Sequence, residues 1–237
     1  MVVPFFNEEI GAPRFLDELK RGVEALAGEV EVLLVDDGSS DGTAAVLEQK
    51  IAGWDGWRVL RQPRNTGQAA ALLHGMQSAA APLIVTLDGD GQNDPADIPA
   101  MVARLDAPER ADMVAGVRAK RNDSWLRKRM SRIANAVRQR VLRDGVRDTG
   151  CGLKAFRKEV VQAFIPIRTL YSFMPALAVA AGFKVVEQAV NHRPRLADES
   201  KYGLGVMLWR PLLDLLGIWW FTRRRFPLAA GGKSCAS

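Results

Sequence analysis

Short apolar runs alternate with helix-like stretches along the first half of the chain, and no other feature constrains its fold as strongly. A buried parallel strand is a nearly continuous apolar run, whereas a covering helix carries apolar residues at a 3.6-residue period. Their alternation predicts an α/β fold with helices on both faces of a mostly parallel sheet. Strands are expected at 2–6, 30–37, 57–62, 83–88 and 112–117, and helices between the later strands at 44–51, 65–80 and 97–105.

The second half of the chain continues this pattern with longer interruptions. A basic amphipathic helix is expected at 124–142, a helix at 173–181 and a strand at 184–190. With 237 residues, the chain has room for one large domain and a short appendage. We expect a catalytic domain at 1–205, with a nucleotide-binding half (1–117) and an acceptor half (118–205), followed by an apolar and basic segment at 206–237.

Acidic residues stand where several of the predicted strands end. Asp36 and Asp37 end one strand, and the sequence Asp88-Gly89-Asp90 follows another. Ligands of such sheets bind beyond the carboxyl ends of the strands. Two carboxylates one residue apart can hold a hard divalent cation such as Mg²⁺ or Mn²⁺, and the side-chain oxygen of Gln92 is close enough in sequence to assist.

These residues carry a resemblance to a known family. The segments 3–9, 35–43, 65–67 and 88–92 resemble, in order and spacing, the family-2 glycosyltransferases, and most of all dolichyl-phosphate mannose synthase and its bacterial undecaprenyl-phosphate relatives. The resemblance covers roughly residues 2–205. It implies a Rossmann-like GT-A fold, a nucleotide-sugar donor and inversion at the anomeric carbon. Of the residues, it implies nucleoside binding by Pro4, Phe6, Glu8, Asp36 and Asp37, and metal binding by Asp88, Asp90 and Gln92.

The same resemblance extends to the acceptor side and implies transfer to a polyprenyl phosphate. Arg118 follows the last strand of the nucleotide half, and Arg127 and Ser131 fall on the basic helix where the family holds the acceptor phosphate. Arg195 and Lys201 match a basic loop over the donor diphosphate. The glycine that usually precedes this Ser-Lys pair is absent, which makes the match of Arg195 weaker than that of Lys201.

Charge and hydropathy at two places predict contact with a membrane surface. Residues 118–147 contain 11 Lys or Arg and 2 Asp, a local charge of +9 that attracts phosphates. The apolar stretch 207–221 would form a helix of roughly 22 Å, shorter than a hydrocarbon core of about 30 Å. Its tryptophans and the arginines that follow are typical of a helix that lies in the interface. We therefore expect a peripheral protein on the cytoplasmic face of a membrane, and the presence of only two cysteines agrees with a reducing compartment.

Two other functions stay open at this point. One is a glycosyltransferase that acts on a soluble, protein or polysaccharide acceptor. The other is a non-catalytic nucleic-acid-binding module that uses the basic block, although this leaves the acidic strand ends unexplained and no nucleic-acid partner is expected. The sequence distinguishes neither UDP from GDP nor one sugar from another, and it does not predict the oligomeric state.

Overall fold

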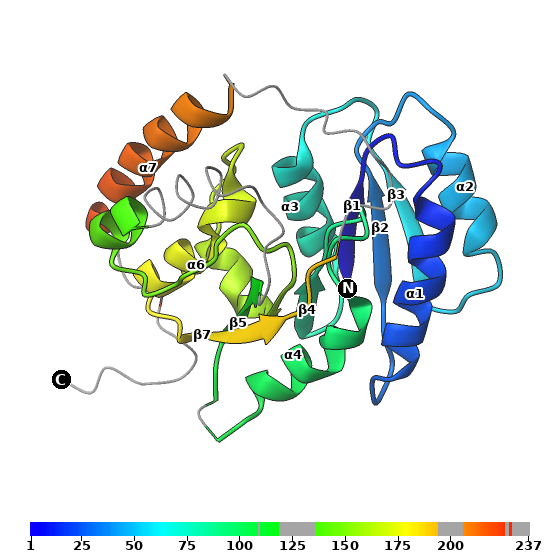
Figure 1. The fold of residues 1–237 in the computed structure, drawn as a ribbon, viewed down its shortest axis with the longest axis horizontal. Helices are drawn as coiled ribbons and strands as arrows, with labels where there is room; N and C mark the ends of the chain where they lie inside the picture. The colour runs from blue at the N-terminus through cyan, green and yellow to red at the C-terminus, as the bar shows by residue number, and fades with distance from the viewer. Residues whose placement is uncertain (109, 119–135, 194–205, 226–227, 229–237) are drawn as a thin grey trace.

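The protein is built around one seven-stranded sheet (Figure 1). The computed structural model describes residues 1–108, 110–118, 136–193, 206–225 and 228, without the side chains of 206–212. The strand order is β3-β2-β1-β4-β6-β5-β7. The strands are β1 (Val2–Phe5), β2 (Val32–Asp36), β3 (Trp57–Arg61), β4 (Leu83–Thr86), β5 (Met113–Arg118), β6 (Lys154–Arg157) and β7 (Val185–Val190).

The sheet is mostly parallel, which confirms the fold class predicted from the sequence. β1 pairs in parallel with β2 and β4, β2 with β3, and β5 with β7. The exception is β6, which runs antiparallel between β4 and β5. The sequence analysis did not predict β6 as a strand. Its insertion brings residues from the second half of the chain beside the end of β4.

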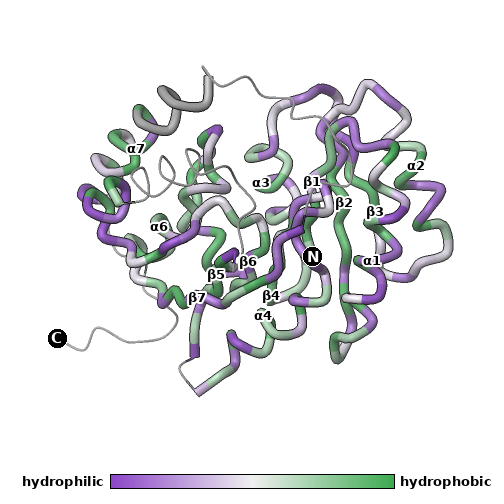
Figure 2. The backbone as a smooth tube through the Cα atoms, in the orientation of Figure 1, coloured by the Kyte–Doolittle hydropathy of each residue, from purple (hydrophilic) through white to green (hydrophobic). Residues whose placement is uncertain are grey.

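Helices cover both faces of the sheet, and the alternation of side chains along each strand explains why. Val3 and Leu34 point into one core cluster, and their neighbours Val2 and Val35 point into the other. Figure 2 shows the central strands as apolar segments. The first face is covered by α1 (Ala12–Glu24), α2 (Thr43–Lys50) and α4 (Ile98–Leu105), and the second by α3 (Gln68–Ser78) and α6 (Leu170–Ala180). The last helix, α7 (Val206–Arg224), packs on α6.

Several predicted boundaries shift by a few residues, for local reasons. The helix expected from residue 65 begins at Gln68, because Gly67 has a φ of +97° that no helix accommodates. The strand expected to reach Asp88 ends at Thr86, where the chain turns into the acidic loop. Two short 3-10 helices are also present, η1 (Pro95–Asp97) and η2 (Lys158–Ala163). Residues 136–142, the described part of the helix expected at 124–142, are helical.

The C-terminal helix is docked on the protein rather than isolated from it. Leu215 and Ile218 of α7 are buried in the second core cluster. Asp214 accepts a hydrogen bond of 2.6 Å from the hydroxyl of Thr169, beside the start of α6. The predicted helix 207–221 therefore exists with slightly wider bounds, and one of its faces is used for packing.

Candidate active site

The loops that follow β1 and β2 are bound to each other by hydrogen bonds. The Asn7 amide donates to the hydroxyl of Ser39 (2.9 Å), and the Asn7 side chain accepts from the backbone of Ser40 (2.8 Å). The Glu8 amide donates to the Thr43 hydroxyl (2.8 Å). Pro4 lies in β1, and Phe6 and Glu8 follow it, so these predicted nucleoside residues meet Asp36 at the carboxyl edge of the sheet.

Asp37 is a buried carboxylate whose four acceptor positions are all used by one loop. Its Oδ1 accepts from the amide and hydroxyl of Thr66 (2.9 and 3.0 Å), and its Oδ2 accepts from Asn65 (3.0 Å) and from the Gly67 amide (2.8 Å). A carboxylate offers about four lone-pair sites. Asp37 therefore orders the loop at 65–67. The resemblance assigned Asp37 to the nucleoside, and a direct contact with the base would have to displace one of these bonds.

Asp88 follows β4, and its carboxylate lies against Gln68 of α3 and against Gly152, just before β6. The side-chain amide of Gln68 donates to its Oδ1 at 2.7 Å. A β-carbon at Gly152 would lie 2.2–2.5 Å from atoms of the Asp88 carboxylate, so a larger residue there would force that side chain to move. Gly152 is itself held, because its carbonyl accepts from the hydroxyl of Thr86 at 3.0 Å.

Asp90 and Gln92 form a tight turn that the end of β7 holds in place. The Asp90 carboxylate accepts from the amide of Gln92 (3.1 Å), and the Gln92 carbonyl accepts from the amide of Arg193 (2.8 Å). The Arg193 side chain pairs with Glu18 (2.7 Å) and with Asp94 (2.5 Å). The acidic turn is thus connected to α1 and to the residues after β7.

The donor atoms of this turn suit a hard cation. Asp88 and Asp90 offer carboxylate oxygens, which Mg²⁺ and Mn²⁺ prefer. Among the described residues, no group of three or more His, Cys, Asp or Glu side chains could enclose a metal ion. An ion at this turn would take the rest of its ligands from waters and substrate phosphates, as Mg²⁺ does in nucleotide sites. When bound, it would supply positive charge to a departing diphosphate.

Arg118, predicted to bind an acceptor phosphate, lies at the end of β5 in a well-shielded ion pair. Its Nε and Nη2 donate to the two oxygens of Asp148 at 2.7 and 2.8 Å, and its backbone amide donates to the same carboxylate at 3.2 Å. The two side chains are only 15% and 9% exposed. Much of the hydrogen-bonding capacity of the guanidinium is therefore committed to Asp148. A role in acceptor binding stays a prediction.

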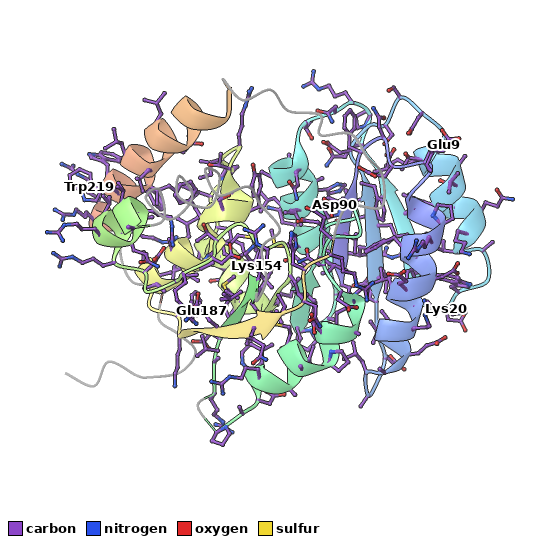
Figure 3. The ribbon with its side chains drawn as sticks, in the orientation of Figure 1. Glu9, Lys20, Asp90, Lys154, Glu187 and Trp219 are labelled. Atoms are coloured by element: carbon purple, nitrogen blue, oxygen red, sulfur yellow. The ribbon has the colours of Figure 1, made fainter. Side chains whose placement is uncertain are left out.

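A lysine lies completely buried close to the acidic turn. Lys154 of β6 donates to the carbonyl of Cys151, and Figure 3 shows it near the centre of the molecule with Asp90. Burial lowers the pKa of the Lys154 ammonium, and the nearby thiol of Cys151 and carboxylate of Asp88 oppose that shift. Burial also raises the pKa of the Cys151 thiol, which makes it an unreactive packing residue.

Sequence reasoning and structure overlap only in part at this site. Asp36, Asp37, Asp88 and Asp90 do gather at one edge of the sheet. Arg127, Ser131, Arg195 and Lys201 lie outside the described residues. The sequence analysis assigned no role to Gln68, Asp148, Gly152 or Lys154. The segment 148–156, which contains the last three, resembles the segment that lies beneath the sugar in the family, whereas no motif included Gln68.

Solved structures with the same fold include several of one enzyme. The chain is similar to glucosyl-3-phosphoglycerate synthase from Mycobacterium tuberculosis solved with UDP, with a TM-score of 0.71 and 20% identity over 93% of this chain and 79% of that one. It is also similar to the same enzyme solved with Mn²⁺ and UDP-glucose (TM-score 0.68, 20% identity, 93% and 78% covered). A third structure contains Mn²⁺, UDP and phosphoglyceric acid (TM-score 0.68, 21% identity, 92% and 77% covered).

These comparisons correct the acceptor expected from the sequence. The prediction of a polyprenyl phosphate acceptor is wrong: the similar structures are of a synthase of glucosyl-3-phosphoglycerate, and they were solved with a soluble phosphoglycerate. The dolichyl-phosphate branch therefore has no support. The error has a physical cause, since the segments that carried the resemblance best lie on the donor side, which does not identify the acceptor. The expected cofactor agrees with the complexes, which contain Mn²⁺ or Mg²⁺ beside UDP.

The family itself follows from a direct match of the sequence. Residues 1–164 match the family model described as glycosyl transferase family 2. That segment includes β1–β6 and the whole acidic edge of the sheet. Because the match spans more than half of the chain, the chain belongs to glycosyl transferase family 2.

Proposed function

We propose that the protein transfers a sugar from a UDP-sugar, with Mg²⁺ or Mn²⁺, to a small soluble acceptor that carries phosphate and carboxylate groups. A phosphorylated hydroxy acid such as 3-phosphoglycerate is the acceptor class we favour. The choice of UDP and of this acceptor rests on the similar solved structures, which contain UDP-glucose and phosphoglyceric acid.

The observation that carries the donor side is the fixed position of Asp88. Its carboxylate lies at the carboxyl end of β4, hydrogen-bonded to the first residue of α3, and Asp37 orders the loop just before that residue. A nucleotide bound across the ends of β1 and β2 would thus have its diphosphate close to Asp88 and Asp90. A divalent cation on these carboxylates would neutralise the leaving diphosphate, so the donor and its metal belong to one site.

The acceptor side is supported by charge. The 11 Lys or Arg between 118 and 147 follow directly on the strand that ends at the site. Such a concentration of positive charge attracts an anionic acceptor and raises its local concentration. A neutral alcohol would gain nothing from it.

A transfer assay tests this proposal. Purified protein and Mn²⁺ are incubated with UDP-glucose, UDP-galactose, UDP-N-acetylglucosamine or GDP-mannose, together with 3-phosphoglycerate, and products are identified by mass spectrometry. We expect a hexosylated phosphoglycerate from one UDP-sugar, lost on addition of EDTA. Glycerate, which keeps the carboxylate but lacks the phosphate, is the matched control and should be a poor acceptor. Equal transfer to glycerate, or no turnover of any UDP-sugar, would contradict the proposal.

The exposed face of α7 supports a second proposal, that the protein associates with an anionic membrane surface. No helix among the described residues is long and apolar enough to cross a bilayer. Leu213, Leu216 and Trp220 are nevertheless 68%, 61% and 55% exposed, and they fall on one face of the helix. Arg223 and Arg224 stack on the rings of Trp219 and Trp220, at 4.6 and 5.0 Å from the ring centroids. Apolar side chains beside tryptophan and arginine fit an interfacial helix on anionic lipid.

A further inference from the structure

Gln68 is a polar side chain of the site for which neither sequence motif nor family match assigns a role. It is the first residue of α3, and its Nε2 lies 2.7 Å from Oδ1 of Asp88. The two residues are 20 positions apart. Gln68 belongs to α3, which packs on β1, and Asp88 follows β4, which pairs with β1. A bond of this length is a normal, strong N–H···O contact.

Gln68 and Gly152 both lie against the Asp88 carboxylate. The Gln68 amide donates to Oδ1, and a β-carbon at Gly152 would lie within 2.2–2.5 Å of Cγ and both oxygens. These two contacts limit the rotation of the Asp88 side chain. Removal of the amide would take away one of them.

The position of Gln68 depends in turn on Asp37. The carboxylate of Asp37 accepts from the Gly67 amide at 2.8 Å and from the Thr66 amide at 2.9 Å, immediately before the helix starts. Gly67 has a φ of +97°, a conformation that other residues rarely adopt. A continuous series of hydrogen bonds therefore joins the end of β2, through the start of α3, to the acidic turn after β4.

The chemistry of an amide suits this position. A neutral donor orients a carboxylate without cancelling its charge, whereas a lysine or arginine at the same place would compete electrostatically with a bound cation. Hydrogen-bond partners that orient metal-binding carboxylates typically change metal affinity or activity by about 10–100-fold when they are removed.

We propose that Gln68 is a positioning residue that holds Asp88 in the orientation in which it binds the divalent cation of the donor complex. The inference rests on the proposed function, because the cation is the one that accompanies the UDP-sugar. The inference goes beyond the proposed function in two respects. It says that Gln68, a residue outside the acidic turn, determines how tightly the cation binds, and that this affinity also depends on the loop that Asp37 orders.

The test measures binding of Mn²⁺ directly, by the loss of the free-ion electron paramagnetic resonance signal, in the presence of UDP. Gln68→Met removes the amide at nearly constant volume. Gln77→Met is the matched control, since Gln77 is exposed near the other end of the same helix. We expect Gln68→Met to weaken Mn²⁺ binding about 10–100-fold and Gln77→Met to leave it unchanged. At saturating Mn²⁺ the kcat of Gln68→Met should return to within a few-fold of wild type.

A second variant and a titration of the wild-type protein distinguish failure of the inference about Gln68 from failure of the proposed function. Gln68→Lys retains a donor but adds positive charge, so it should bind Mn²⁺ even more weakly than Gln68→Met while its Tm stays close to wild type. If Gln68→Met or Gln68→Lys binds Mn²⁺ as tightly as wild type, the inference is wrong. If wild-type protein itself binds no Mn²⁺ with UDP, the proposed function fails instead.

Discussion

The two carboxylates of the Asp88-Gly89-Asp90 turn have different surroundings. Asp88 is held by groups from α3 and from the segment before β6, whereas Asp90 accepts a bond from Gln92 within its own turn. Asparagine at position 90 would keep the size of the side chain and an oxygen that can accept the bond from Gln92.

Asp90→Asn should accordingly lose activity and keep its fold. The substitution removes one negative charge from the predicted cation site, and we expect kcat to fall by at least about 10²-fold, as for other losses of electrostatic stabilisation in a transition state. The measurement is UDP release with Mn²⁺, beside a thermal melt. Wild-type activity in a folded Asp90→Asn protein would contradict the assignment of the metal site.

Asp37 should behave in the opposite way. Asp37→Ala leaves the amides of Thr66 and Gly67 and the side chain of Asn65 without their acceptor in a buried place. Because each unsatisfied buried donor costs about 1–3 kcal/mol, we expect a loss of roughly 3 kcal/mol in the free energy of unfolding after partial rehydration. Urea denaturation measures it. Asp55→Ala, at an exposed position, is the control and should change stability by less than about 0.5 kcal/mol.

The individual acidic residues were predictable, but their partners were not. Carboxylates at the ends of apolar strands stand out in a sequence because they interrupt a clear pattern. Gln68 does not stand out, since a glutamine at the start of a helix is ordinary. Its contact with Asp88 forms only when α3 and β4 are packed against the same strand, β1. This packing cannot be predicted from a short stretch of the sequence.

Among the secondary-structure elements, β6 is the one that the sequence did not predict and that the site needs. Its four residues are too few for a clear alternation, and the strand is defined by pairing with β4 and β5 rather than by its own composition. The strands β2, β3, β4 and β5 were predicted to within two residues at each end because each is a distinct apolar run. The antiparallel insertion of β6 is what brings Gly152 against Asp88.

Gly152→Ala tests the importance of this close approach. The added methyl group would displace the Asp88 carboxylate, so we expect kcat/KM to fall by about 10²-fold, as for a small misplacement of a catalytic group. Gly217→Ala in α7 is a matched control, because a β-carbon there meets no atom within 4 Å. UDP release at saturating acceptor provides the readout. Equal activity of the two variants would mean that the position of Asp88 is not critical.

Viewed across the entire chain, residues 1–117 were more predictable than residues 118–205. Each motif in the first range is a short continuous segment, so it can be recognised without knowing the fold. An acceptor is selected by side chains brought together from distant segments, and several of the predicted ones lie outside the described residues. This is why the fold and the family were correctly anticipated while the polyprenyl phosphate acceptor was not.

The α7 surface predicts how the intact protein behaves with lipids. Leu216→Glu places a negative charge in the middle of the exposed apolar face, and we expect it to reduce sedimentation with vesicles rich in phosphatidylglycerol at least several-fold. Ile10→Glu is the control, since Ile10 is also exposed but neighbours Glu9, which Figure 3 places at the opposite end of the molecule from Trp219. No sedimentation of wild type, or an equal effect of both variants, would exclude α7 as the lipid-binding surface.

The most direct test of the donor site is a crystal grown with UDP and Mn²⁺, with diffraction data collected at the manganese absorption edge. The anomalous signal locates the ion without reference to any assumed chemistry. We predict one strong peak within coordination distance of Asp88 or Asp90 and of the UDP diphosphate, with the nucleoside across the ends of β1 and β2. Ordered UDP with its manganese away from both carboxylates would contradict the assignment of the site.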